Sequence, residues 1–306
     1  IDQTNFKDEK FKNDKLFESR AAGLISYFNP GQENYPKVNE TNEIKADMST
    51  YQFMEYSAIR KIEQELEIGP KGKRRRVLSR AMGSSQMATS STMRQYSRQY
   101  CDFVFPREIP RPFRKALIKK KNKKNNKKEE KNEKKITKKY ETNVQHALRE
   151  LYDDRNKYLN KELGTYSPKM KIIMEKIKKE PGIHLIYSDF KTLSGIGIMS
   201  LVLEAHGFTR YEGKSKSLTS KAPRYCMYTG GTTMEQRKRM IQQSNKSENK
   251  NGDFVKVLMI TKAGAEGLDL KNIRNVHIME PYWYETRIQQ VIGRAVRNCS
   301  HKNLPY

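Results

Sequence analysis

Apolar and polar positions follow two different periods in the C-terminal half of the chain. Short apolar runs of strand length separate longer segments in which apolar residues recur at helical spacing. The runs cover residues 183–187, 224–228, 254–260 and 276–279, and the helical segments cover 168–179, 193–206, 232–243 and 285–297. Strands that alternate with helices of about ten or more residues predict a parallel sheet with helices on both faces. We therefore expect an α/β domain over residues 164–306.

Two of these helices carry a recognisable start. Ser167 stands directly before Pro168, which predicts a capping serine followed by proline at the first helical position. Thr232 and Glu235 have the spacing of a capping box, in which each side chain bonds the backbone N–H of the other residue.

Residues 1–163 are predicted to form a mainly helical region. Helical spacing indicates helices over residues 14–28 and about 49–66, the second capped by Ser49. The apolar stripe of that second helix comprises Phe53, Tyr56, Ile59 and Ile62. Residues 69–93 are predicted to be an exposed loop, and Asp102–Phe105 resembles a short strand.

Basic residues are concentrated in one segment, which predicts a basic insertion within the helical N-terminal region. The net charge is +26, and residues 71–140 hold 24 Lys/Arg against five acids, which places +19 of the surplus there. The low-complexity stretch Lys119–Lys139 cannot bury enough apolar area to offset ordering, so we expect a partly disordered basic surface insertion. A surplus of this kind favours nucleic acid as a partner. A solvated lysine-rich face and a dedicated DNA-binding arm are the alternatives.

Composition excludes several other classes. The three cysteines are far apart and lack CxxC spacing, which argues against a disulfide framework or a zinc site and fits a reducing compartment. We expect no metal site in this chain. No run approaches about 18 apolar residues, so we expect no membrane span. The chain starts at Ile1 without a signal peptide or an initiator Met, and we expect it to be a fragment.

Candidate chemistry begins directly after the run 254–260, in the segment Thr261–Leu270. Ligands of open parallel sheets sit at the carboxyl ends of the strands. Gly264 and Gly267 would let the backbone approach a phosphate or ribose, Thr261 supplies a hydroxyl, and Asp269 supplies an acceptor for sugar hydroxyls. A tight strand-to-helix turn without a ligand is the alternative for this segment taken alone.

A second candidate lies in the last predicted helix. Gln290, Arg294 and Arg297 have offsets of four and three, which places them on one helical face, and Gly293 keeps that face open beside Arg294. Two guanidinium groups on one face suit a triphosphate, because each can fork onto phosphate oxygens. A surface helix whose arginines pair with acids is the alternative.

These segments together resemble a known family. Thr261–Leu270 looks like motif V and Gln290–Arg297 like motif VI of the second RecA-like lobe of superfamily 2 helicases, while 185–190 and 228–231 are similar to motif IV and the TG element. The phrases TLSGIGIMSLVLEAHGF, YTGGTT and ITKAGAEGLDLKNIRNVHIMEPYW narrow the resemblance to Snf2-like helicases of nucleocytoplasmic large DNA viruses. That group includes the poxvirus-type early transcription factor small subunit and a nucleoside triphosphate phosphohydrolase.

The resemblance implies a role for each matching residue. In that family ATP sits between two RecA-like lobes, and the second lobe supplies arginine fingers to the γ-phosphate. Arg294 and Arg297 would be those fingers, and Gln290 would help orient the nucleotide or couple it to the bound strand. Gly267 and Asp269 would lie near the ribose. The residues implied to contact the nucleic-acid backbone are Ser188, Thr229, Gly230 and Thr261.

The chain departs from the family pattern in two ways. It contains neither a GxxxxGK[ST] loop nor a DExx box, so the first lobe with its magnesium ligands is expected elsewhere, and it stops at Tyr306 soon after motif VI. We therefore expect residues 1–163 to be a connecting region, residues 164–306 to be a C-terminally truncated lobe, and the isolated chain to be unable to hydrolyse ATP.

The expected function is the second lobe of a nucleic-acid-dependent ATPase that translocates on or remodels DNA in viral transcription. An RNA helicase shares the same motifs, and a non-catalytic nucleic-acid-binding scaffold is the other alternative. The implied cofactors are ATP and Mg²⁺. The implied partners are DNA, the first lobe, and an RNA polymerase or a transcription factor subunit. The implied location is the virion or the host cytoplasm.

Overall fold

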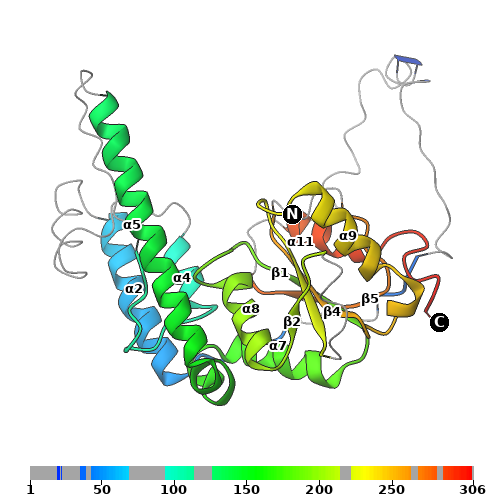
Figure 1. Ribbon diagram of the computed structural model, residues 1–306, viewed down its shortest axis with the longest axis horizontal. Helices are drawn as coiled ribbons and strands as arrows, with labels where there is room; N and C mark the ends of the chain where they lie inside the picture. The colour runs from blue at the N-terminus through cyan, green and yellow to red at the C-terminus, as the bar shows by residue number, and fades with distance from the viewer. Residues whose placement is uncertain are drawn as a thin grey trace, which may run out of the picture.

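One parallel sheet forms the centre of the C-terminal half (Figure 1). The computed structural model describes residues 19–20, 22, 35–38, 43–68, 94–113, 126–213, 222–262, 268–280 and 285–304. In the described chain, five strands pair in the order β2-β3-β4-β1-β5. Their bounds are β1 (Ile183–Tyr187), β2 (Thr209–Arg210), β3 (Arg224–Tyr228), β4 (Val255–Ile260) and β5 (Ile273–Ile278). The parallel α/β fold expected from the sequence is confirmed.

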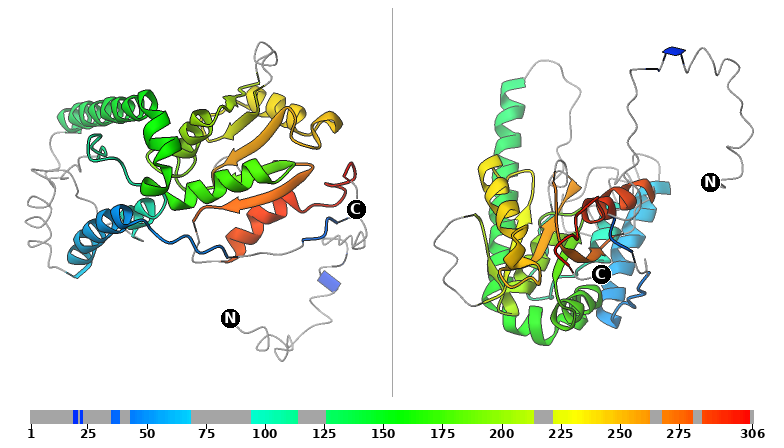
Figure 2. Two further views of the ribbon diagram at one scale, coloured as in Figure 1. Left: turned by 90° about the horizontal axis from the view of Figure 1, so that it is seen from below. Right: turned by 90° about the vertical axis from the view of Figure 1, so that its right-hand side faces the viewer.

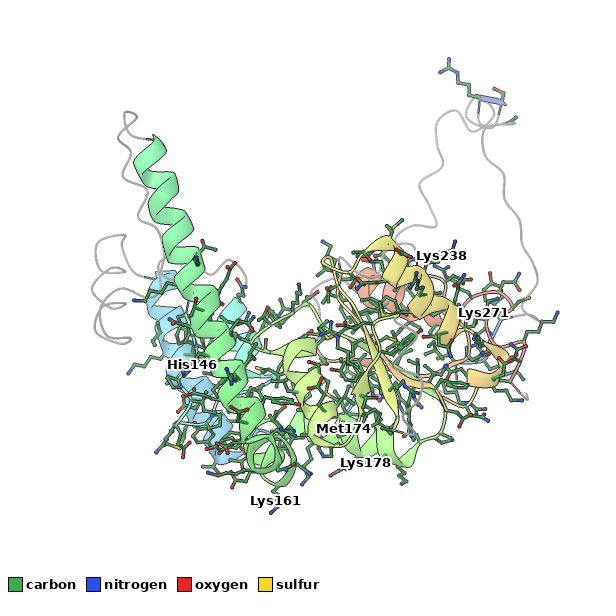
Figure 3. The ribbon with its side chains drawn as sticks, viewed as in Figure 1. His146, Lys161, Met174, Lys178, Lys238 and Lys271 are labelled. Carbon is green, nitrogen blue, oxygen red and sulfur yellow. The ribbon has the colours of Figure 1, made fainter. Side chains whose placement is uncertain are left out.

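Helices cover both faces of this sheet (Figure 2). One face packs against α7 (Pro168–Lys179) and α8 (Gly195–Ala205), and the other packs against α9 (Met234–Ser244) and α11 (Glu285–Ala295). A 3-10 turn, Ser247–Asn249, joins α9 to β4. On α7, Met174 is buried in the core while Lys178, one turn later, is exposed (Figure 3).

The helix starts depend on local caps. The Ser167 side chain accepts a hydrogen bond from Met170 N, and Pro168 occupies the first turn, so this predicted start is confirmed. The predicted capping box from Thr232 to Glu235 is wrong by one residue. Thr233 is the cap, and its reciprocal partner is Gln236. Thr232 is engaged instead by the preceding turn, because its hydroxyl accepts from Thr229 N at 3.2 Å.

A bulge near the start of β4 sets the register in which this strand pairs with β3. Arg224 pairs with Val255 but Tyr225 pairs with Val257, so Lys256 is the extra residue. A bulge turns the following side chains to the other face. Val255 accordingly packs in the cluster under α9 and α11, whereas Val257 packs under α7 and α8. Beyond the bulge the ladder is regular to the carboxyl end of the strand.

The described part of the N-terminal region is helical. Its elements are α2 (Thr50–Ile68), α4 (Gln95–Tyr100), α5 (Asn126–Asp153), a π-helix (Lys157–Lys161) and α6 (Leu163–Tyr166). Ser49 caps α2 by accepting from Gln52 N at 3.0 Å. The predicted stripe is only partly right, because Ile59 is buried but Phe53 is 57% exposed. The rotation of α2 instead buries polar Gln52, whose amide donates to Tyr100 O at 2.8 Å.

The segment predicted to be a strand, Asp102–Phe105, is buried without forming one. Its backbone makes isolated hydrogen bonds instead of pairing with a strand. Val104 N donates to Tyr166 O at 3.1 Å, and Ser167 Oγ donates to Asp102 O. Phe103 joins one apolar cluster with α7, α8 and β4, so the core runs across residues 163 and 164 without a break. The loop predicted over 69–93 and most of the helix predicted over 14–28 lie outside the described residues.

Candidate nucleotide and nucleic-acid site

Three predicted contact residues meet at the carboxyl edge of the sheet. Tyr187 of β1 and Tyr228 of β3 both pair with Ile260 of β4. The residues that follow these three strands therefore lie side by side, in the order Thr229, Thr261 and Ser188. Ser188 N donates to Ile260 O at 3.2 Å, and Thr261 N donates to Tyr228 O at 3.3 Å. The sheet register therefore gathers residues that are 73 positions apart in the chain, from Ser188 to Thr261.

The Ser188 hydroxyl is engaged inside the protein. It is fully buried and donates to Glu280 Oε1 at 2.5 Å, while Asp189 N donates to Glu280 Oε2 at 2.9 Å. Burial, and then the charge of Asp102, raises the pKa of the Glu280 carboxyl well above its usual range. Glu280 thus fixes the turn after β1 from the end of β5.

Glu280 belongs to a buried charged cluster that extends to the N-terminal region. Lys169 Nζ lies 2.6 Å from Asp102 Oδ1 and donates to Met279 O at 2.7 Å. Burial alone would lower the pKa of the Lys169 ammonium, but the charge of Asp102 and its hydrogen bond raise it overall. Sequence reasoning assigned none of these residues. The sequence signal that could have identified Glu280 is its position as a charged residue directly after the apolar run 276–279.

The loop after β3 carries Thr229 and Gly230. Thr232 N closes a turn onto Thr229 O at 3.1 Å, and Arg237 Nη2 of α9 donates to the same carbonyl at 2.7 Å. Gly230 is exposed at the tip of this turn. The exposed Lys191 adds a cation here, since its Nζ lies 3.8 Å from where a Cβ of Gly231 would stand. Arg237 and Lys191 were not identified from the sequence.

The two halves of the predicted nucleotide site also meet. Arg297 Nη1 lies 3.5 Å from Asp269 Oδ1, although the residues are 28 positions apart. Helix α11 ends at Ala295, two residues earlier than needed to carry Arg297, and Arg297 Nε bonds Gly293 O at 3.4 Å instead. Arg294 is half-buried on α11.

The outward face of α11 is open. Gln290 is exposed and lines a shallow hollow together with Glu285, Thr286 and Gln289. A Cβ built at Gly293 would meet no atom within 4 Å, so packing does not require glycine there. Gly267, the other predicted nucleotide residue, lies outside the described residues.

Neither a metal cluster nor a membrane span is found in the described parts of the chain. No group of three or more His, Cys, Asp or Glu residues there could hold a metal ion. None of the described helices has the length and apolar character needed to cross a bilayer.

Comparison with known proteins gives matches over the same region. Residues 169–299 match the helicase conserved C-terminal domain. A protein of Acanthamoeba polyphaga mimivirus named "Putative ATP-dependent RNA helicase" is 30% identical over 343 residues, covering 95% of this chain and 40% of the relative. An African swine fever virus protein (isolate Pig/Kenya/KEN-50/1950) named "Termination factor NPH-I homolog" is 28% identical over 331 residues, covering 95% of this chain and 41% of the relative.

Among solved structures, the C-terminal part of the Fun30 ATPase domain matches with 17% identity and a TM-score of 0.47, covering 83% of this chain and 79% of that one. The chain spans about two fifths of the length of the curated relatives that it matches. The resemblance found from the motifs of the sequence is confirmed. Residues 169–299 match the helicase conserved C-terminal domain, and the chain is similar to helicase and termination-factor proteins of large DNA viruses.

Proposed function

We propose that this chain supplies the second lobe of a nucleic-acid-dependent ATPase. Arg294 and Arg297 contact the γ-phosphate of ATP, Gln290 orients the nucleotide, and Asp269 and Gly267 lie near the ribose. The observation that supports this most directly is the approach of Arg297 Nη1 to Asp269 Oδ1, which brings motif V and motif VI together. The alternative of a helix arginine paired with an acid requires the same contact, so the variant test below decides between the two.

The geometry of this pair is compatible with nucleotide binding. The contact is 3.5 Å long, and the side chains of Arg297 and Asp269 are 35% and 60% exposed. Exposed ion pairs of this kind contribute about 1 kcal/mol or less. A triphosphate offers Arg297 a stronger, charge-assisted partner, so exchange of Asp269 for phosphate is favourable. The Mg²⁺ ligands are assigned to the first lobe, as the resemblance to two-lobe helicases implies.

The nucleic-acid partner is proposed from the carboxyl edge of the sheet, whereas the contact of Asp269 with Arg297 lies toward the amino end of β5. Thr229, Gly230, Thr261 and the neighbouring Ser188 would meet the phosphate backbone, and DNA is favoured over RNA. The basic segment 71–140 would add salt-sensitive, non-specific affinity. If it does, deletion of residues 115–140 should reduce the slope of log affinity against log salt, and an unchanged slope would contradict this role.

A role in viral transcription, with an RNA polymerase or a transcription factor subunit as partner, is proposed from the name of the African swine fever virus relative. The corresponding location is the virion or the host cytoplasm. Hydrolysis assays with single-stranded DNA, duplex DNA and RNA separate a DNA translocase from an RNA helicase, which is the activity named for the mimivirus relative.

The central test uses the natural polypeptide that joins this chain to a first RecA-like lobe, here called the two-lobe protein. Arg294→Ala and Arg297→Ala should each lower its stimulated ATP turnover by roughly 10³–10⁵-fold. Arg239→Ala, in an exposed pair with Glu235 on α9, is the matched control and should leave turnover unchanged. Full turnover in both finger variants would contradict the proposal and favour a non-catalytic scaffold. The 306-residue chain alone should show no hydrolysis.

A further inference from the structure

A carboxylate at the carboxyl end of β1 joins three elements that are distant in the sequence. Asp189 Oδ2 lies 3.1 Å from Arg98 Nη2 of α4, and Asp189 Oδ1 lies 3.3 Å from Arg287 Nη1 of α11. Tyr187 completes the set by donating its hydroxyl to Oδ1 at 2.8 Å. The three charged side chains are only 15–22% exposed, so water screens these pairs less than it screens surface pairs.

Asp189 itself is held firmly. Its backbone N–H donates to Glu280, which is 3% exposed and also accepts from Ser188 Oγ. Strands β1 and β5 are paired along their length, so both partners of this contact stand on the rigid sheet. Asp189 is therefore an anchor to which Arg98 and Arg287 are attached, rather than a mobile side chain that follows them.

Arg287 lies on the same stripe of α11 as the predicted nucleotide residues. Gln290 and Arg294 follow it by three and seven positions, which on a helix places all three along one side. Arg98 reaches the same carboxylate from the N-terminal region, and its guanidinium lies 5.3 Å from the centre of the Phe190 ring. Fixing Arg287 thus fixes the rotation of α11, while Arg98 connects that rotation to α4.

We propose that Asp189 is a positioning residue that sets the orientation of the arginine-bearing helix α11 and couples it to helix α4. This inference rests on the proposed function only for its catalytic consequence. A displacement of α4 would alter the shared carboxylate and so change the presentation of Arg294. Nucleic acid bound beside the N-terminal helices could then influence hydrolysis through Asp189.

Hydrogen exchange in the 306-residue chain tests the coupling without reference to ATP. The variant Asp189→Asn keeps the shape of the side chain and removes its charge. Amides of 285–295 and 95–100 should then exchange about tenfold faster, because both helices lose a partly buried anchor. The matched control is Asp253→Asn, an exposed aspartate two residues before β4 at the amino edge of the sheet. Unchanged exchange in α11 would overturn the proposal.

Kinetics of the two-lobe protein test the catalytic consequence. Asp189→Asn should lower kcat by about tenfold per folded molecule while KM for ATP changes less than about twofold, and Asp189→Glu should restore part of the loss. Arg287→Met should also lower kcat, and the double variant should be no worse than Asp189→Asn alone, because Asp189→Asn already removes the contact with Arg287. Additive losses would show only general destabilisation and would overturn the positioning role.

The two proposals can fail separately. Wild-type two-lobe protein without stimulated hydrolysis, or full activity in Arg294→Ala, would contradict the proposed ATPase function. The exchange comparison between Asp189→Asn and Asp253→Asn would still decide whether Asp189 couples α4 to α11. Faster exchange in α11 with normal kcat would overturn the catalytic part of the inference alone.

Discussion

Gly293 on α11 offers a test that separates folding from function. The residue is helical, and a Cβ built there would meet no atom within 4 Å. Glycine in a helix interior is about 1 kcal/mol less favourable than alanine. Because Gly293 stands in the last turn of α11, we expect Gly293→Ala to raise the free energy of unfolding by roughly 0.5–1 kcal/mol.

The same methyl group should impair hydrolysis. It would stand on the open side of α11 beside Arg294, where the proposed triphosphate approaches. A displacement of about 1 Å between reacting groups can reduce turnover by about 10²-fold. We therefore expect kcat/KM of the two-lobe protein to fall by at least about tenfold in Gly293→Ala, although the fold becomes more stable.

Urea unfolding followed by circular dichroism, combined with stimulated ATPase assays, measures both effects. Gly207→Ala is the control, because a Cβ at Gly207 also meets nothing within 4 Å but its φ is +86°. This left-handed backbone should make that variant less stable by about 1–2 kcal/mol. Gly293→Ala with unchanged hydrolysis would refute the proposed approach of nucleotide to this face. A lower free energy of unfolding in Gly293→Ala would refute the helical and sterically open environment described for Gly293.

Three further predictions concern the core. His277 bonds His184 at 3.0 Å, and burial, followed by the charge of His184, lowers the pKa of His277 to about 3. In the unfolded chain the same imidazole binds a proton below a pKa of about 6.5, so the free energy of unfolding should fall as the pH is lowered from 6.5 toward 3. His277→Gln should flatten that dependence in urea titrations. Lys169→Met should cost about 3–5 kcal/mol by leaving the fully buried Asp102 carboxylate unpaired, measured by urea unfolding at pH 7, and a cost below about 1 kcal/mol would contradict this. Phe103→Ala should cost about 3–5 kcal/mol and lower a single thermal transition, whereas two separate transitions would show that residues 43–163 do not share the core of the sheet.

Elements with a strong local signal could be predicted closely. The strands β1 and β3 have the predicted bounds, because each is a short and mostly apolar segment that the sheet buries on both faces. Helix α7 likewise begins and ends as predicted, since Ser167 and Pro168 determine its start. These signals are contained in a few neighbouring residues, and tertiary contacts reinforce them.

Other features depend on what packs against them and could not be predicted. Asp102–Phe105 has the composition of a strand, but among the described residues its backbone pairs with no strand and bonds the turn before α7 instead. Phe53 fits the apolar period of α2, yet the helix is rotated so that Gln52 and Glu63 are buried and bond the α4 segment. In both cases a polar tertiary contact outweighs the local pattern.

In the candidate site, too, the motif residues could be identified from the sequence, but the contacts between residues far apart in the chain could not. Motif spacing identified Asp269 and Arg297, and the structure brings them together because Asp269 precedes the amino end of β5, where the chain after α11 also packs. Spacing gave no role to Asp189, whose partners Arg98 and Arg287 lie 91 and 98 positions away. A sequence pattern can select side chains that suit a phosphate, but their orientation depends on such distant pairs. The chemistry proposed for Arg294 therefore depends on a carboxylate that only the three-dimensional arrangement connects to it.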